Sequence, residues 1–186
     1  MTRAQDTSAS APGASSHPAT PARPVFLVGP SGSFPPAAIA AETIFRIWTE
    51  LPAPAPPALV WASEEGAPQL IDHLRTRVLS QAATPKGLDP EALQSVVHGA
   101  LDEGATLIAG GLPEGKSGFA PTLFVHLDVK SRLTSPQAPV GPILAVLAAE
   151  PPASADATLA ALSGSLAFHR LGEDGRLDSS PTHPTT

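Results

Sequence analysis

The segment Gly110–Ser117 has the spacing of a phosphate-binding loop. It reads GGLPEGKS, fits the pattern G-x-x-x-x-G-K-S, and follows a predicted strand. In such a loop, backbone N–H groups and the lysine hold the phosphates of a nucleotide, and a helix must begin directly after the lysine. Here Gly118 and Pro121 interrupt that stretch. We therefore favour a glycine-rich hairpin or loop, and a P-loop-like nucleotide binder stays as an alternative function.

Other side chains that could hold a metal or act as a nucleophile are sparse. Glu64 and Glu65 are adjacent, so their carboxylates point apart and are expected to be solvated. With zero cysteines, the chain has no thiol nucleophile, disulfide or thiolate metal ligand. No Gly-x-Ser-x-Gly elbow marks a serine hydrolase. No two histidines have the spacing of a metal site, and they stand at positions 17, 73, 98, 126, 169 and 183. We predict no metal and no catalytic residue.

Charge and hydropathy argue against two classes of partner. The formal net charge is -6 and the few Lys and Arg residues are scattered, so a nucleic-acid backbone has no basic stripe to bind. No apolar run approaches the ~20 residues that span a bilayer. The Ser, Ala and Pro residues at the start lack the apolar stretch of a secretory signal. We expect a soluble cytoplasmic protein.

Short apolar runs alternate with amphipathic segments along the middle of the chain. The best-formed helix begins at Asp89 as N-cap with Pro90 at the first position, and it stops at Gly104. This alternation predicts an α/β class with a largely parallel sheet. The predicted strands are 24–28, 58–62, 106–109, 119–125 and 143–147, and the other predicted helices are 37–50, 64–75 and 155–162.

Composition divides the chain into a domain with two loose ends. Residues 1–22 hold hardly any large apolar side chain, too little to offset the entropy of ordering, and are expected to be a disordered arm. Residues 169–186 have a similar character and are expected to be a loose tail. The domain covers 23–168, with lobes 23–78 and 88–168 joined by a short linker.

Several separate motifs resemble the aldehyde dehydrogenase family. In that family, a helix ending in Gly-Ala leads to a strand and Gly-Gly, then to Gly-x-x-x-Pro-Thr, then to Glu-Glu-x-Phe-Gly-Pro. The matching residues here are Asp89–Gly111, Gly118–Leu123 and Val140–Leu144, in the same order and spacing. Upstream, Val28–Pro35 resembles the family's Lys-Pro-Ser-Glu-x-x-Pro segment. The resemblance covers about residues 24–168 and implies a partial Rossmann-like sheet with flanking helices.

The departures from the family pattern fall on the residues that hold the cofactor. The family lysine that bonds the adenosine ribose falls at Gly29, and the glutamate of that segment falls at Gly32. The glutamate that holds the nicotinamide ribose falls at Ala138, its neighbour at Gln137, and the phenylalanine at Val140. These degenerate positions offer no side-chain contact of the original kind. We therefore predict that neither NAD nor NADP binds.

Between Val78 and Glu91 the chain also omits the family span that carries the glycine-rich turn, the general-base glutamate, the oxyanion asparagine and the cysteine. The family chemistry needs that thiolate, an oxyanion donor and a positioned nicotinamide. We expect a catalytically inactive remnant that acts by protein interaction, with a full-length aldehyde dehydrogenase or with itself. The alternative from the enzyme class is NAD(P)-dependent aldehyde oxidation retained with a partner.

Overall fold

A mixed sheet forms the centre of the molecule. The computed structural model describes residues 22–29, 34–51, 55–81, 88–115, 118–135, 138, 140–149, 162 and 166–177. Its six strands lie in the order β3-β6-β7-β2-β1-β8, and every neighbouring pair is parallel except β3 with β6. The bounds are β1 (Arg23–Val28), β2 (Ala58–Ala62), β3 (Thr106–Ala109), β6 (Thr122–Val125), β7 (Ile143–Ala148) and β8 (Leu166–Leu171). The predicted α/β class with a largely parallel sheet is confirmed.

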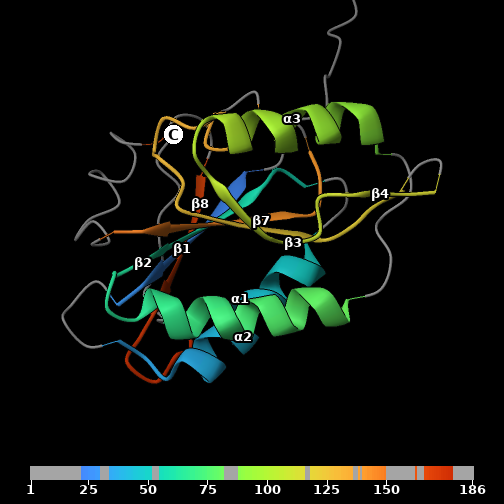
Figure 1. The fold of residues 1–186 in the computed structure, drawn as a ribbon. Helices are drawn as coiled ribbons and strands as arrows, with labels where there is room; N and C mark the ends of the chain where they lie inside the picture. Colours follow the sequence, from blue (N-terminus) through green and yellow to red (C-terminus); the bar gives the residue numbers. More distant parts are fainter. Residues whose placement is uncertain are drawn as a thin grey trace, which may run out of the picture.

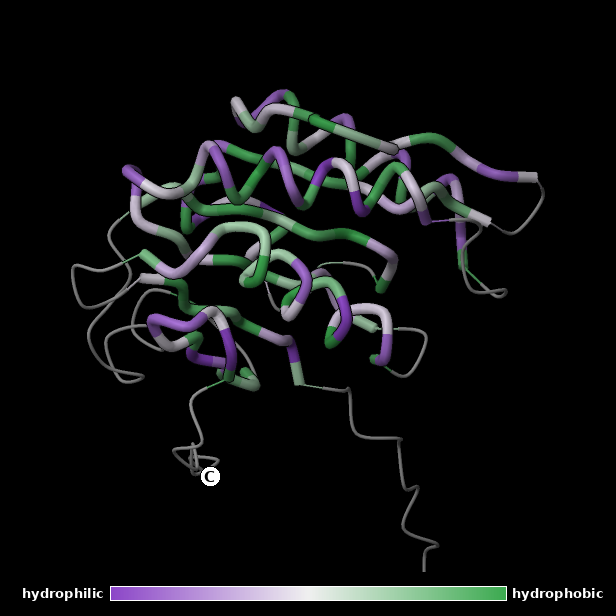
Figure 2. Tube along the Cα trace, turned by 90° about the horizontal axis from the view of Figure 1, so that it is seen from below, coloured by the Kyte–Doolittle hydropathy of each residue, from purple (hydrophilic) through white to green (hydrophobic). Residues whose placement is uncertain are grey.

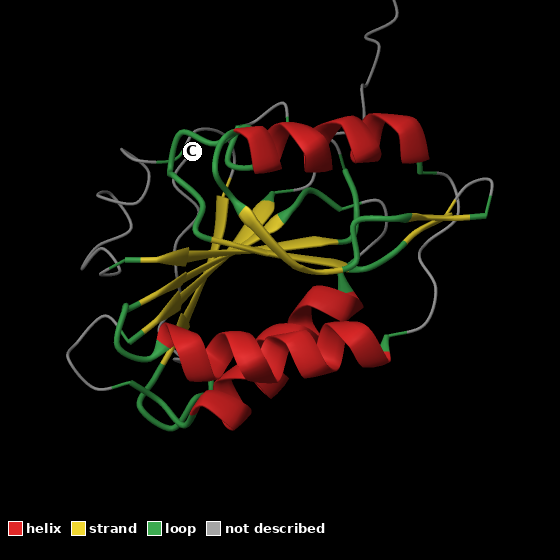
Figure 3. Cartoon of the chain, in the orientation of Figure 1, coloured by secondary structure: helices red, strands yellow, loops and turns green. Residues whose placement is uncertain are grey.

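Helices cover the sheet on both faces. The helices α1 (Ala37–Glu50) and α2 (Ala67–Ser80) lie together below the sheet, and α3 (Pro90–Asp102) lies above it (Figure 1). Figure 3 shows the same three layers by element type. A small separate hairpin of β4 (Pro113–Glu114) and β5 (Gly118–Phe119) extends from the end of β3. Among the described helices, none has the length and apolar character needed to cross a membrane.

The central strands form because they are apolar on both sides. Every residue of β1 and β2 is buried. Successive side chains point to opposite faces of a strand, so Phe26 and Val28 pack toward α1 and α2, while Val25 and Leu27 pack toward α3. Figure 2 shows hydrophobic residues gathered along the strands and both kinds alternating along the helices. The sheet therefore separates two apolar cores.

Local signals in the sequence place the helices. In α1, Ala40, Ile44 and Trp48 are buried at intervals of four residues, which puts them on one face. In α3, the carboxylate of Asp89 accepts hydrogen bonds from the backbone N–H groups of Glu91 and Ala92, each at 3.1 Å. This is the N-cap that the sequence predicts.

The two predicted lobes share one sheet. Strand β2 from the first lobe pairs in parallel with β7 from the second, with Ala58 opposite Leu144 and Ala62 opposite Ala148. Helix α2 also packs against β6 and β3 of the second lobe. The hydrogen bonds across β2 and β7 therefore hold both segments in one structure.

Two predicted elements differ at their bounds. The helix expected from Glu64 begins at Ala67 and continues to Ser80, because Ser63 to Gly66 form a turn in which Ser63 O accepts the Gly66 N–H at 3.2 Å. The strand expected from Phe119 to Val125 is divided into β5 and β6, because Pro121 has no N–H to donate to a ladder.

One strand lies where the sequence predicts the start of a loose tail. Strand β8 pairs with the whole length of β1, from Arg23 opposite Leu166 to Val28 opposite Leu171. Its residues are half-buried up to Leu171, and His169 and Arg170 break the apolar pattern. For residues 169–171 the expected tail was therefore wrong. The predicted helix 155–162, apart from Leu162, and the predicted arm up to residue 21 lie outside the described residues.

Candidate functional site at the carboxyl edge of the sheet

The topology places the candidate ligand site between the ends of β2 and β7. After β2 the chain enters α2, which packs into the lower core. After β7 it crosses to β8, and Leu162 in that connection packs into the upper core beneath α3. Crossovers between parallel strands are right-handed, so two connections that run in opposite directions along the sheet lie on opposite faces, as these two do. Adjacent strands that send the chain to opposite faces form the crevice where α/β sheets bind ligands.

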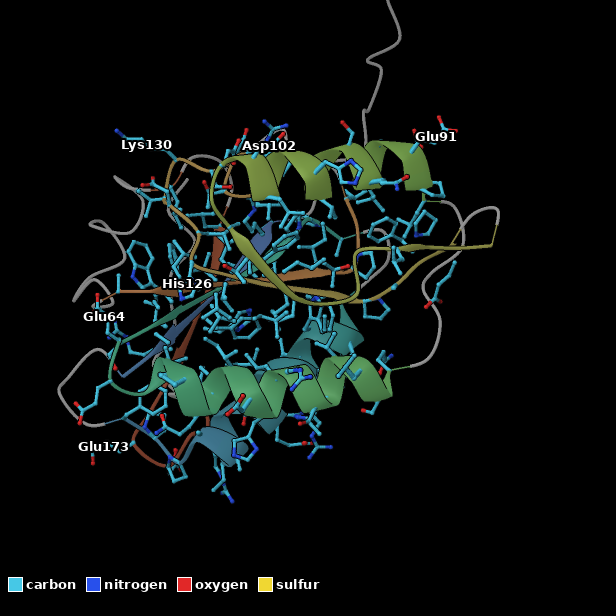
Figure 4. The ribbon with its side chains drawn as sticks, in the orientation of Figure 1. Glu64, Glu91, Asp102, His126, Lys130 and Glu173 are labelled. Atoms are coloured by element: carbon cyan, nitrogen blue, oxygen red, sulfur yellow. The ribbon has the colours of Figure 1, made fainter. Side chains whose placement is uncertain are left out.

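Four exposed acidic side chains lie at the carboxyl edge of the sheet. Glu64 and Glu65 follow β2 and are exposed, and Glu173 and Asp174 follow β8 and are exposed as well. Figure 4 shows Glu64 and Glu173 at the same edge of the sheet as His126, which follows β6. Four carboxylates at the strand ends make this edge electrostatically unfavourable for an anion.

An aromatic ring fills the space beside the crevice. A Cβ placed on Gly66 would lie 2.1 Å from Cδ2 of Phe34, and one placed on Gly29 would lie 3.1 Å from the same atom. The ring of Phe34 therefore rests directly on the backbone at the end of β1 and at the start of α2. Position 66 needs glycine because a Cβ there would overlap the ring of Phe34. Gly29 adopts a φ of 77°, which favours glycine.

The N-terminus of α2 lacks the features of a phosphate site. A helix N-terminus binds phosphate through free backbone N–H groups and its positive dipole end. Here Pro68 removes one of those donors, and Gly66 and Ala67 donate to Ser63 O at 3.2 and 3.0 Å. Glu64 and Glu65 bring negative charge to the same place. The diphosphate of a dinucleotide would meet repulsion and few donors here.

The degenerate cofactor positions lie at opposite ends of the sheet. Gly29 follows the last residue of β1 at the carboxyl edge. Ala138 and Val140 precede the first residue of β7, and Gly141 donates to Ala55 O just before β2, which places them at the amino edge. A strand of this length separates the two edges by roughly 20 Å. The structure therefore does not bring these positions together, and Gly32 lies outside the described residues.

The segment with phosphate-loop spacing forms the β4–β5 hairpin. Strand β5 begins at Gly118, where a phosphate loop needs a helix. A Cβ on Gly110 would lie 2.0 Å from Pro121 O, so this glycine permits a close backbone approach, and Thr122 Oγ1 accepts the Gly111 N–H at 2.9 Å. Lys116 and Ser117 lie outside the described residues. The structure therefore shows the glycine-rich hairpin that the sequence favoured over a phosphate-binding loop.

The histidines are dispersed. His73 and His98 are exposed on α2 and α3. His126 has a φ of 58°, unusual for a residue other than glycine, and its Nδ1 lies 3.3 Å from Thr106 Oγ1. His169 stacks on Phe26 with ring centroids 5.1 Å apart, and burial lowers its pKa. Within the described residues, no three acidic or histidine side chains are placed to hold a metal, and His17 and His183 fall outside them.

Sequence reasoning missed a buried arginine at the start of β1. Arg23 is 4% exposed, and its guanidinium donates to Thr134 O at 2.5 Å and to Ser135 O. Burial lowers the pKa of Arg23 to about 10, so the group stays charged at neutral pH. The only signal in the sequence was a charged residue directly before an apolar strand. Arg23 therefore has a structural role, because its hydrogen bonds hold the turn that precedes β7.

A polar groove runs along the outer side of α3. It has a volume of about 490 Å³ and is lined by Glu91, Gln94, Ser95, His98, Gly99, Asp102 and Arg132. The guanidinium of Arg132 lies against Gly99, where a Cβ would come within 1.9 Å of it. Arg132 Nε also pairs with Glu103 Oε1 at 2.7 Å. Desolvation acts to raise the pKa of Glu103, but hydrogen bonds from Arg132 and Ser131 outweigh it and hold that pKa below its usual value.

Comparison with solved structures identifies the fold. A benzaldehyde dehydrogenase from Corynebacterium glutamicum superposes with a TM-score of 0.63 at 17% identity, over 82% of this chain and 35% of that one. The NADP-dependent glyceraldehyde-3-phosphate dehydrogenase from Bacillus halodurans gives 0.58 at 18% identity, over 75% and 30%. An NAD-dependent aldehyde dehydrogenase from Sinorhizobium meliloti gives 0.56 at 18% identity, over 75% and 29%.

The similarity is one of fold, and it covers only part of the length of these dehydrogenases. The chain spans about a third of each of these dehydrogenases. No family model matches the sequence, and no curated protein matches it. The predicted resemblance to aldehyde dehydrogenases is therefore confirmed at the level of the fold.

Proposed function

We propose that this chain is a catalytically inactive relative of the aldehyde dehydrogenases that acts by protein interaction. Three facts support the proposal. The chain has the fold of part of those enzymes. It has no cysteine to form a thiohemiacetal. Exposed acidic side chains lie at the carboxyl edge of its sheet, and the ring of Phe34 lies on the backbone at the end of β1 and the start of α2.

The packing of Phe34 on Gly66 carries most of the argument. A pocket for a dinucleotide needs open backbone at the ends of neighbouring strands. In this chain a side chain of its own lies there, 2.1 Å from a Cβ built on Gly66. The two carboxylates that precede α2 add repulsion toward a diphosphate.

Calorimetric titration with NAD and with NADP tests the cofactor part of the proposal. We expect no saturable heat at millimolar cofactor, and an intact aldehyde dehydrogenase titrated in the same buffer is the positive control. Saturable binding of either cofactor to this chain would contradict the proposal. So would reduction of NAD by the chain alone in the presence of an aldehyde.

Co-purification tests the interaction part. We expect the tagged chain to retain an intact aldehyde dehydrogenase from its own organism and to alter that enzyme's turnover. Sedimentation of the chain alone then distinguishes pairing with the enzyme from self-association. A monomer that retains no dehydrogenase would remove the interaction part and leave the cofactor result standing.

A further inference from the structure

Arg132 is held in a fixed position beside helix α3. It belongs to the turn 128–135, which is anchored by the fully buried side chain of Leu133 in the upper core. The carboxylate of Glu103 accepts hydrogen bonds from Arg132 Nε at 2.7 Å, from the Arg132 backbone N–H at 3.0 Å and from Ser131 Oγ at 2.8 Å. The pair uses Nε, so the terminal amines Nη1 and Nη2 have no partner among the described residues. The direction of the guanidinium is therefore set before any ligand binds.

Gly99 makes room for this guanidinium on the helix. Glycine is among the least favourable residues inside a helix, so its presence there needs a reason. A Cβ at position 99 would lie 1.9 Å from Nη1 and 2.1 Å from Cζ of Arg132. The guanidinium therefore lies against the backbone of α3, and it forms part of the wall of the polar groove along that helix.

The groove has more negative charge than positive. Arg132 and Glu103 neutralise each other, whereas Glu91 and Asp102 have no ion pair within the part of the chain that the structure describes. Figure 4 shows Glu91 and Asp102 toward opposite ends of α3, about 16 Å apart along the helix axis. Gly99 and the guanidinium lie between them in the helix sequence. The groove therefore offers two free amines of one guanidinium and two unpaired carboxylates.

We propose that this groove binds a free basic α-amino acid, L-lysine or L-arginine. The α-carboxylate binds the terminal amines of Arg132, because a guanidinium matches the two oxygens of a carboxylate. The α-ammonium binds the carboxylate of Asp102, and the cationic side chain extends past Gln94 and Ser95 to Glu91. The groove volume of about 490 Å³ is sufficient for such a molecule. This site goes beyond the proposed function and does not depend on it.

Ligands that lack one of these charges fit the groove less well. A simple anion would meet Arg132, but Asp102 and the carbonyl end of α3 would repel it. A simple diamine would satisfy the carboxylates and leave the guanidinium amines unpaired. Because Arg132, Asp102 and Glu91 are all exposed, solvent weakens each contact, and we expect a Kd on the order of 1 mM.

Titration of the full chain with L-lysine and with L-arginine, followed by the backbone amide signals in NMR, tests the site. We expect saturable shifts at Ser95, Gly99, Asp102 and Arg132. Three analogues of L-lysine each lack one charge: cadaverine lacks the carboxylate, Nα-acetyl-L-lysine the α-ammonium, and L-norleucine the side-chain cation. Each should bind about tenfold more weakly. Absence of saturable shifts with both amino acids, or equal binding of cadaverine and L-lysine, would overturn the proposal.

The variant Gly99→Ala tests the placement of the guanidinium. Its Cβ displaces only the flexible end of Arg132, and alanine favours the helix, so the variant should fold. We expect it to bind L-lysine about tenfold more weakly than the unaltered chain. The control Lys130→Gln removes a positive charge from the same turn, outside the groove, and should bind as the unaltered chain does.

Amide spectra and far-UV circular dichroism melts establish that both variants are folded. Unchanged binding of L-lysine to Gly99→Ala would show that the guanidinium on α3 does not hold the ligand, and the proposal would fail. Equal losses in Gly99→Ala and Lys130→Gln would show general charge attraction instead of a site, with the same consequence.

Discussion

At the residue scale, Phe34 and Gly66 decide how the carboxyl edge is filled. The backbone of Gly66 has a φ of -95° and a ψ of -15°, which any residue adopts, so its glycine is required by the adjacent ring and not by the backbone. A Cβ at this site would force the ring of Phe34 to move. The pair therefore offers a direct measure of how tightly the crevice is packed.

We predict that Gly66→Ala lowers the free energy of unfolding by about 1–3 kcal/mol, the usual cost of overpacking. Removing the ring with Phe34→Ala should abolish most of that cost, so the double variant should be more stable than the sum of the two single effects predicts. Urea unfolding of the four proteins measures this coupling. Additive single effects would show that the ring and Gly66 do not touch in solution.

The stability of the chain should depend on the protonation of His169. Burial against Phe26 lowers the pKa of His169 below its usual value near 6.5, so the unfolded chain binds the proton more readily than the folded chain. The contribution of neutral His169 to the free energy of unfolding is complete above pH 6.5. It is lost as the pH falls from there toward the pKa that His169 has in the folded chain.

Urea unfolding between pH 7.5 and 5 measures this dependence. The variant His169→Phe keeps a ring against Phe26 and cannot titrate. We expect its free energy of unfolding to fall less over this interval than that of the unaltered chain. Parallel pH profiles for the two proteins would assign the pH dependence to other groups.

At the element scale, the sequence predicted best the segments whose signals are local. Helix α1 has the predicted bounds, and α3 begins at its predicted cap because Asp89, Pro90 and the apolar face all act within a few residues. Strand β8 was missed because its stability comes from a partner far away in sequence. Leu166 pairs with Arg23, and His169 is accommodated by the ring of Phe26.

The cap of α3 is itself testable. Asp89→Ala removes the acceptor for the N–H groups of Glu91 and Ala92, and we predict a loss of about 1 kcal/mol in the free energy of unfolding. Asp89→Asn keeps an oxygen in the same place and should stay within a few tenths of a kcal/mol. Thermal or urea melts compare the three proteins. Equal losses for both variants would mean that charge, and not the hydrogen bonds, supports the helix start.

At the scale of the whole molecule, the pairing of β2 with β7 joins the two predicted lobes in one sheet. The chain carries two tryptophans, Trp48 in the lower core and Trp61 in the upper core. The fluorescence of each tryptophan therefore reports on the core that lies on one face of the sheet.

We therefore predict a single unfolding transition seen equally by both probes. The variants Trp48→Phe and Trp61→Phe leave one tryptophan each, and their fluorescence melts should each coincide with the transition of the same variant followed by far-UV circular dichroism. Non-coincident probes would show that the two cores unfold separately. Absence of any cooperative transition would show that the chain does not form a stable fold.

The sequence by itself determined the class of the fold, the central strands and the starts of α1 and α3, because burial and capping patterns lie within short segments. It also determined that no cysteine chemistry is possible within this chain. Only the tertiary structure showed that Phe34 covers Gly66, that Gly29 and Val140 lie at opposite edges, and that β8 completes the sheet. Those facts depend on contacts between residues distant in the sequence, and no local pattern records which distant segment will supply them.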